Sequence, residues 1–517
     1  MDALHDWRQP ALPELDRAGD REFKAQVRGH YDRLAERRDG WYRRNRRYHD
    51  YLEVRLRSLI PAGRSVLELG CGTGNLLSAL APAVGVGVDL SPAMVEISRV
   101  KFPGLTFEVQ DAEALDGERR FDFIVASDLI GELLDISAML DRLQAVSTDD
   151  TRLILTFHNP ALEAVLRIAQ RLGLTMPPAR QNWIGPVDAV GLLRLADFEV
   201  ERVHSGLLLP ALLPGLRALA DAEHRALVLG YLNTVNIIVA RPTRPRPRVW
   251  PLSCSVIIPC RNEVGNIEAA VTRMPVMGSH TEILFVDGAS TDGTVEQVEA
   301  MRRRFAGVKD IRLLHQVPAS GPPDPASVAP DAPVAMLRLG KGDAVRKGFD
   351  AAQGEVLMIL DADLTVPPED LPRFFHAIAS DKADFLNGSR LLYPMEERAM
   401  KFVNYLGNKL FSALFTWMLG QRIRDTLCGT KALRRDQYQR IRAGRAEFGD
   451  FDPFGDFDLL FGAARLGLRI LDVPVRYRRR RSGVTKVRVV RHGLLLIAMS
   501  IVAFRKFKLR GWVRKWR

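Results

Sequence analysis

Residues 356–363 read VLMILDAD, five apolar residues followed by two acids that flank one alanine. An uninterrupted apolar run of this length predicts a strand buried on both faces, as in a parallel sheet covered by helices. Because alternate residues of a strand point to opposite faces, the chain must turn after Leu360 for Asp361 and Asp363 to reach one ion. Two carboxylates are hard oxygen ligands of the kind that Mg²⁺ or Mn²⁺ prefers.

Strand-like runs alternate with helical ones on both sides of this segment, which predicts two α/β units built on parallel sheets. The runs lie at residues 65–69, 84–90, 105–109, 121–127 and 152–157, and again at 254–259, 282–287, 356–363 and 470–475. Residues 241–248, RPTRPRPR, cannot continue a helix or a central strand and therefore mark a boundary. The expected divisions are an N-terminal extension (1–30), a first domain (31–240), a linker (241–250) and a second domain (251–517).

The charge of the chain is concentrated at its C-terminal end. The 517 residues carry a net charge of +12, and the last 45 hold 15 Lys/Arg with no Asp or Glu. Such a basic tail suits an anionic membrane surface or a phosphate-bearing substrate. Nucleic acid is not expected as a partner, because the cations flank an apolar segment instead of forming a separate arm.

The longest apolar run, residues 493–504, is too short to cross a bilayer, which needs about 20 residues. Its flanking cations favour an amphipathic interfacial helix, with a buried core helix as the alternative. The four cysteines lie far apart and indicate reduced thiols, and the N-terminus lacks the apolar core of a signal peptide. We therefore expect a cytoplasmic protein bound peripherally to the inner face of the membrane.

The first domain contains a glycine turn between a strand and a helix. Its turn, Gly70-Cys71-Gly72-Thr73-Gly74, follows Glu68 and lets the backbone approach a ligand closely. It is not the G-x-G-x-x-G of dinucleotide binders, so it does not imply a pyrophosphate. The next two strands end at Asp89, where a carboxylate can bond a ribose diol, and at Gln110-Asp111-Ala112, where one can bond an adenine amino group.

In this order, the glycine turn and the two acids resemble the Rossmann-like class I methyltransferases that use S-adenosylmethionine, over about residues 31–241. The resemblance implies that Glu68 contacts the methionine end of the cofactor and that Asp89 holds its ribose. It further implies a cofactor-binding set of Glu68, Gly70, Gly72, Gly74, Asp89, Asp111 and Ala112. The methyl acceptor is not indicated. His158 and Asn159 lie where acceptors bind, or simply cap a loop. The domain could also bind cofactor without catalysing transfer.

Four further pieces of the second domain accompany the VLMILDAD segment. They are Pro259 to Glu263 after the first strand, Asp287 after the second, Gly340-Lys341-Gly342 at a helix start, and Asn387-Gly388-Ser389-Arg390 after a later strand. A carboxylate at Asp287 can bond a nucleobase or ribose, and the fork of Arg390 suits a phosphate.

Together these pieces resemble glycosyltransferase family 2, from residue 253 to about 509, and within it the dolichyl- or polyprenyl-phosphate sugar synthases. The resemblance implies the A-type nucleotide-diphospho-sugar transferase fold and a metal-dependent, inverting reaction. The implied site residues are Pro259, Arg261, Glu263 and Asp287 at the nucleoside, Asp361, Ala362 and Asp363 at the nucleotide and metal, and Arg390, Arg398 and Lys486 at phosphates. Gly288-Ala289 and Thr365 depart from the usual motifs, so the base contacts and the third metal ligand stay open.

Lipid phosphate is the favoured acceptor. Its second pKa is about 6, so it is largely a dianion at neutral pH and needs no strong general base. A glycan hydroxyl would need such a base, and Asp458 or Asp456 is then the candidate, unless these acids only cap a helix. The apolar segment 400–419 could receive a lipid tail. The alternative hypothesis is a family 2 enzyme that extends a cell-surface polysaccharide, with a non-catalytic N-terminal module.

Overall fold

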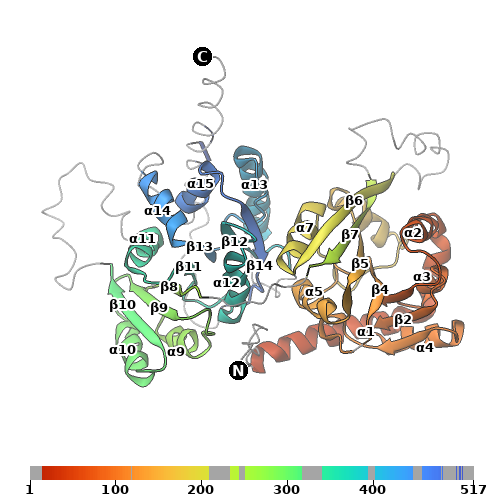
Figure 1. Ribbon diagram of the computed structural model, residues 1–517, viewed down its shortest axis with the longest axis horizontal. Coiled ribbons are helices and arrows are strands. Elements are labelled where there is room, and N and C mark those ends of the chain that lie inside the picture. The colour runs from red at the N-terminus through yellow and green to blue at the C-terminus, as the bar shows by residue number, and fades with distance from the viewer. Residues whose placement is uncertain are drawn as a thin grey trace, which may run out of the picture. The chain divides into compact units, whose positions relative to one another are not determined.

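The computed structural model divides the chain into two compact units, with the division between Pro247 and Arg248 (Figure 1). The structure describes residues 14–117, 119–208, 233–243, 251–316, 340–393, 402–445, 457–478, 480, 497, 500, 501 and 504.

The first unit contains a seven-stranded sheet of order β3-β2-β1-β4-β5-β7-β6. Strands β1 to β5 are parallel, as the sequence predicts, whereas β7 pairs antiparallel with both β5 and β6. The strands are β1 Ser65–Leu69, β2 Val84–Asp89, β3 Thr106–Val109, β4 Phe121–Ser127, β5 Ser147–His158, β6 Phe198–Leu208 and β7 Asn233–Pro242.

Helices cover this sheet, and two of them precede its first strand. Leu52 and Leu56 of α2 are buried against Val66 and Ile154 of the sheet. The helices are α1 Glu14–Arg44, α2 Arg46–Leu59, α3 Asn75–Ala79, η1 Ala112–Ala114, α4 Pro92–Lys101, α5 Ile136–Ala145, η2 Pro160–Leu162, α6 Glu163–Arg171 and α7 Pro186–Leu195.

The expected limits of the first domain need two corrections. Helix α1 is continuous from Glu14 through residue 31 and packs on α4, so residues 14–30 are not a separate extension. Strand β7 continues to Pro242, which pairs with Phe198, so the first two linker residues belong to the sheet. Proline has no backbone N–H to donate to the sheet, so it is tolerated at the last position of the strand.

The second unit contains a seven-stranded sheet of order β10-β9-β8-β11-β13-β12-β14. Strand β13 is antiparallel to β11 and β12, and the other pairs are parallel. The strands are β8 Cys254–Cys260, β9 Thr281–Asp287, β10 Asp310–His315, β11 Val356–Ile359, β12 Phe385–Ser389, β13 Lys431–Arg434 and β14 Ile470–Pro474. All four residues of β11 are buried, which confirms the predicted central strand that precedes the two acids.

Helices again cover both faces of this sheet, which confirms the α/β class predicted for both halves. They are α9 Val264–Thr272, α10 Thr294–Arg304, α11 Lys341–Ala351, η7 Pro368–Asp370, α12 Leu371–Ala379, α13 Phe402–Leu419, α14 Arg435–Ala443 and α15 Phe457–Arg465. Ile497, Ser500, Ile501 and Phe504 are also helical, and the predicted amphipathic helix otherwise lies outside the described residues. Within the described ranges, none of the helices is both long and apolar enough for a bilayer crossing.

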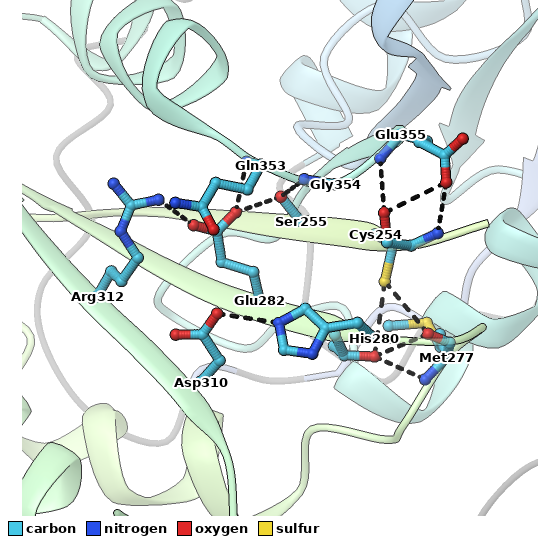
Figure 2. A network of polar contacts seen from close by, with 12 residues as sticks. Cys254, Ser255, Met277, His280, Glu282, Asp310, Arg312, Gln353, Gly354 and Glu355 are labelled. Carbon is cyan, nitrogen blue, oxygen red and sulfur yellow. Dashed lines mark hydrogen bonds and ion pairs between the residues drawn. The ribbon is translucent and has the colours of Figure 1, made fainter. Parts of the chain in front are cut away.

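A buried carboxylate fixes the amino ends of the central strands of the second unit (Figure 2). Glu282, near the start of β9, is fully buried and accepts hydrogen bonds from the Ser255 hydroxyl and from Gln353 N at 2.8 Å. Arg312 of β10 forms an ion pair with it. Asp287 ends the same strand, so this network fixes strand register at the edge opposite the candidate site.

Candidate functional site

The glycine turn of the first unit has a left-handed backbone. Gly72 and Gly74 have φ angles of +53° and +77°, which favour glycine. Gly72 N donates to Asp89 Oδ2 at 2.8 Å, and Ser91 N donates to Asp89 Oδ1 at 2.9 Å. Burial raises the pKa of Asp89, although these two N–H groups oppose the shift. Asp89 therefore joins the glycine turn to the end of β2.

Helix α1 is bonded to all three loops that the sequence predicts as ligand-binding. Asp39 accepts from Thr73 Oγ1 at 2.7 Å in the loop after β1, and Asp32 accepts from Ser91 Oγ at 2.5 Å after β2. Lys24 forms an ion pair with Asp111 after β3. The helix therefore crosses the carboxyl edge of these strands. The carboxylate of Asp111, which was predicted to bond adenine, is paired with Lys24.

Three glutamates lie at this edge, Glu68 buried and Glu113 and Glu132 half-buried, and desolvation raises the pKa of each. The pKa of Glu68 and of Glu132 rises to about 8, and that of Glu113 to about 7. The Tyr31 hydroxyl of α1 donates to Glu132. Glu68 Oε2 is buried and has no hydrogen-bond partner among the described residues. The pKa values of these carboxyl groups therefore lie at or just above neutral pH.

A second polar group lies after β4 and β5. The Tyr48 hydroxyl donates to Asp128 Oδ2 at 2.6 Å, and the rings of Tyr48 and His158 have centroids 5.3 Å apart. Asp128 Oδ1 and His158 Nδ1 are buried without hydrogen-bond partners in the described parts of the chain. Asn159 caps η2 by accepting from Ala161 N at 3.0 Å. The loop-capping alternative is therefore confirmed for Asn159. His158 Nδ1 makes no such capping hydrogen bond among the described residues.

In the second unit, Asp361 is surrounded by cations. Lys341 Nζ lies 2.5 Å from Asp361 Oδ1. Burial alone would raise the pKa of Asp361, but the charges of Lys341, Lys431 and Arg390 lower it, so the group is ionised. A Cβ on Gly429 would overlap both Lys341 Nζ and the Asp361 carboxylate. Only glycine leaves room for this pair.

Asp363 has a different cation as its partner. Arg480 Nη2 lies 2.5 Å from Asp363 Oδ2, and Thr365 N and Oγ1 donate to Asp363 Oδ1 at 3.1 and 2.9 Å. Among the described residues no group of three or more His, Cys, Asp and Glu side chains is placed to hold a metal. A cation bound at these two acids would therefore take its remaining oxygens from a ligand or from water.

Arg390 is held by a buried acid. Its Nε and Nη2 donate to the two carboxylate oxygens of Asp425 at 2.7 and 2.8 Å, and its guanidinium lies 5.1 Å from the Tyr477 ring centroid. Burial opposes both charges, yet the pairing lowers the pKa of Asp425 and raises that of Arg390. Its predicted role at phosphate stays a prediction, because this fork is already engaged.

The two loops predicted to hold the nucleoside are bonded to each other. Asn262 N donates to Ser290 Oγ at 2.9 Å, and Glu263 N donates to Thr294 Oγ1 at 2.9 Å. Asp287 is buried and accepts from Ser290 N at 3.3 Å, whereas Arg261 is exposed. The loops after β8 and β9 thus form one surface beside Pro259.

Sequence families match both units. Residues 41–203 match a methyltransferase domain, and residues 255–318 and 337–442 match glycosyl transferase family 2. The chain joins a methyltransferase domain to a glycosyl transferase family 2 domain. It is therefore a transferase enzyme.

The glycosyltransferase domain is similar to polyprenyl-phosphate mannosyltransferases. The undecaprenyl-phosphate mannosyltransferase of Micrococcus luteus is 28% identical over 238 residues, which cover 45% of this chain and 86% of that protein. The polyprenol monophosphomannose synthase of Mycolicibacterium smegmatis is 27% identical, covering 50% of this chain and 91% of that protein. For the methyltransferase domain, a solved S-adenosylmethionine-dependent methyltransferase of Thermotoga maritima is 19% identical, covering 42% of this chain and all of that one, with a TM-score of 0.34.

Asp458, the candidate base of the glycosyltransferase domain, is buried near the start of α15. Arg445 Nε donates to its Oδ2 at 3.1 Å, and Arg346 Nη1 lies 3.7 Å away. Two positive charges stabilise the ionised carboxylate of Asp458, which favours a structural role in ion pairs over a role as a general base. Asp456, Arg398 and Lys486 lie outside the described residues.

Several residues of the two sites were not predicted. Lys24, Tyr31 and Arg38 of α1 face the methyltransferase site, and their seven-residue spacing is the signal that could have found them. Lys341 lies in the glycine-flanked segment noted at the start of α11. Arg480 belongs to a run of four arginines, in which charge alone does not single out one residue.

Proposed function

We propose that the chain is a bifunctional transferase. The glycosyltransferase domain transfers a sugar from a nucleotide diphosphate to a polyprenyl phosphate with inversion and with a divalent metal. The methyltransferase domain transfers the methyl group of S-adenosylmethionine to an acceptor that is not identified. Both similar mannosyltransferases carry a polyprenyl or undecaprenyl phosphate in their names, which supports this acceptor class.

The cation cluster around Asp361 carries the proposal. Lys341, Lys431 and Arg390 all act on a single carboxylate at the end of β11. Because Asp425 pairs with Arg390, the group has three positive charges against the two carboxylates of Asp361 and Asp425. The remaining positive charge favours a further anion, and a nucleotide diphosphate is such an anion. The loop after β8 lies on the strand adjacent to β11, and β9 is the next strand of the sheet beyond β8.

The reaction follows from the charge of the acceptor. An oxygen of the lipid phosphate attacks the anomeric carbon, the bond from that carbon to the diphosphate oxygen breaks, and the nucleoside diphosphate leaves. Asp363 and Asp361 fit a Mg²⁺ or Mn²⁺ ion by their hard oxygen atoms, and the ion would neutralise charge on the diphosphate. The ion pairs of Asp458 favour the phosphate acceptor, because a glycan hydroxyl would require this residue to be free as a base.

Exposed apolar side chains of the second unit support a membrane-bound acceptor. Leu410 and Trp417 of α13 are 68% and 56% exposed, and Ile497, Ile501 and Phe504 are exposed as well. The Trp417 and Phe504 rings are stacked with centroids 5.9 Å apart. We assign these side chains and the basic tail to peripheral contact with an anionic membrane, on its inner, cytoplasmic face.

The methyltransferase half rests on the site at the carboxyl edge of β1 to β3. Glu68, the glycines at positions 70, 72 and 74, Asp89, Asp111 and Ala112 would hold S-adenosylmethionine there. The open backbone at Gly72 and the unbonded oxygen of Glu68 fit the methionine end of that molecule. When bound, S-adenosylmethionine supplies an electrophilic methyl group, and the chain has only to align a nucleophile with it.

A donor screen tests the glycosyltransferase half. The full chain is incubated with each labelled nucleotide sugar, Mn²⁺ and either polyprenyl phosphate or a free glycan, and label is followed into organic solvent. We expect lipid-soluble label from one donor, its loss in Asp363→Asn and its retention in Asp89→Ala. Label that enters only the glycan would favour polysaccharide extension, and loss of transfer in folded Asp89→Ala would show that the two activities are not independent.

A further inference from the structure

Arg38 is a cation at the methyltransferase site without a bonded partner. It is half-buried on α1, and its Nε lies 3.6 Å from the point that a Cβ on Gly72 would occupy. None of the described residues forms a hydrogen bond or an ion pair with it. A guanidinium has five N–H donors and no acceptor, so a half-buried one requires an anionic or water ligand.

Three carboxyl groups lie near enough to Arg38 to interact with its charge, although none is bonded to it. Burial raises the pKa of Glu68, Asp89 and Glu132, and the charge of Arg38 opposes that rise in all three. Its charge is thus felt at the ends of β1 and β2 and beyond the end of β4. Arg38 is near these carboxyl groups but is bonded to none of them.

Glu68 provides a hydrogen-bond acceptor at the same turn. It is 3% exposed, one side of its carboxyl group is bonded by Leu77 N, and Oε2 has no partner among the described residues. Next to Gly72, therefore, one guanidinium and one carboxyl oxygen both lack a hydrogen-bonding partner. An α-amino acid carries an ammonium and a carboxylate on one carbon, and this pair of groups is its complement.

We propose that Arg38 binds the carboxylate of the methionine end of S-adenosylmethionine while Glu68 receives its ammonium. This inference rests on the methyl-donor part of the proposed function. It assigns to α1 the carboxylate contact that the glycine turn and the acids after β2 and β3 do not provide. A bidentate guanidinium–carboxylate pair is the favoured geometry for such a contact.

The test compares two ligands that differ only in that carboxylate. Calorimetric titration of the full chain measures the Kd of S-adenosylmethionine and of decarboxylated S-adenosylmethionine, which keeps the adenosine, the sulfonium and the ammonium. We expect Arg38→Met to weaken the first ligand about 10- to 100-fold and to change the second by less than about threefold. Arg38→Lys should restore part of the affinity, since it keeps the charge but not the fork.

Arg37→Met is the matched control, because Arg37 is the exposed neighbour on the same helix. It should leave both Kd values unchanged. Equal weakening of both ligands by Arg38→Met would reduce Arg38 to support for the fold and overturn the proposal, as would an unchanged Kd for S-adenosylmethionine. If the wild-type chain binds neither ligand, the methyl-donor proposal fails first, and this inference fails with it.

Discussion

The ammonium of Lys341 lies 2.5 Å from the carboxylate of Asp361. One residue is the first of α11 and the other follows β11, so the pair joins a helix start to the end of the central strand. Gly429, from the segment before β13, packs against both groups with no space for a side chain. The position of the pair therefore depends on a residue that carries no functional group.

Gly429→Ala tests whether the placement of this pair matters for sugar transfer. The added Cβ would overlap the ammonium and the carboxylate, so one of them must move. A displacement of about 1 Å at a reacting site costs about 100-fold in rate, and we expect a loss of that size. The measurement is label transferred from the nucleotide sugar to polyprenyl phosphate, with the thermal unfolding midpoint recorded for the same variant.

Gly407→Ala is the control for this substitution. Gly407 lies within α13, and a Cβ there meets no atom within 4 Å. Alanine is the better helix former by about 1 kcal/mol, so stability should rise slightly and transfer should not change. Full activity in Gly429→Ala would mean that the Lys341–Asp361 geometry is not required.

Asp425→Asn tests the buried partner of Arg390. Asp425 is fully buried, and its removal leaves a guanidinium charge without compensation. Breaking a buried pair in this way costs about 3–5 kcal/mol, which we expect in the urea unfolding of the second unit. Asp381→Asn breaks a pair with Arg469 in which the acid is 86% exposed, and it should cost less than about 1 kcal/mol. If Asp425→Asn lowers the free energy of unfolding by as little as Asp381→Asn does, a structural role for Asp425 is contradicted.

Strand ends could be predicted from the sequence because apolar runs are local signals. The run before Asp361 is the central strand β11, and the glycine turn follows β1 as expected. Antiparallel β7 and β13 were not predicted, since their direction is set by pairing partners elsewhere in the sheet. Local periodicity is the same for both directions.

Partners distant in sequence could not be predicted. Lys24 and Asp111 are 87 residues apart, and Arg390 and Asp425 are 35 apart. A sequence shows that Arg390 is a cation after a strand, but only packing shows that a buried acid already binds its fork. The same holds for α1. The partners of its polar side chains could not be predicted until the structure placed the helix along the edge of the sheet.

The raised carboxyl pKa values give the methyltransferase domain a defined pH response. Burial raises the pKa of Glu132 to about 8, whereas an unfolded Glu has a pKa of about 4.3. Between these values the folded state binds more protons than the unfolded state, so the free energy of unfolding falls as pH rises, by up to about 1.4 kcal/mol per pH unit for this group.

Glu132→Gln should flatten this slope, because the amide cannot ionise and still accepts from Tyr31. Scanning calorimetry of the full chain at pH 5, 6.5 and 8 measures the change, and the transition that moves in the variant identifies the methyltransferase domain. A wild-type slope in Glu132→Gln would show that this carboxyl group does not titrate in the folded state over that range.

Trp417→Ala tests the membrane contact of the glycosyltransferase domain. Trp417 is 56% exposed, and its ring is stacked on Phe504 at an interplanar angle of 20°. An exposed indole gains free energy when it moves from water into the headgroup region, so its loss should weaken binding to anionic vesicles about tenfold. Leu174→Ala is the control, since Leu174 is 51% exposed but belongs to the other domain.

Sedimentation with phosphatidylglycerol vesicles measures both variants, and added salt should weaken wild-type binding by screening the basic tail. If both substitutions reduce binding equally, general surface apolarity explains the contact; if neither does, the basic tail binds the membrane without α13.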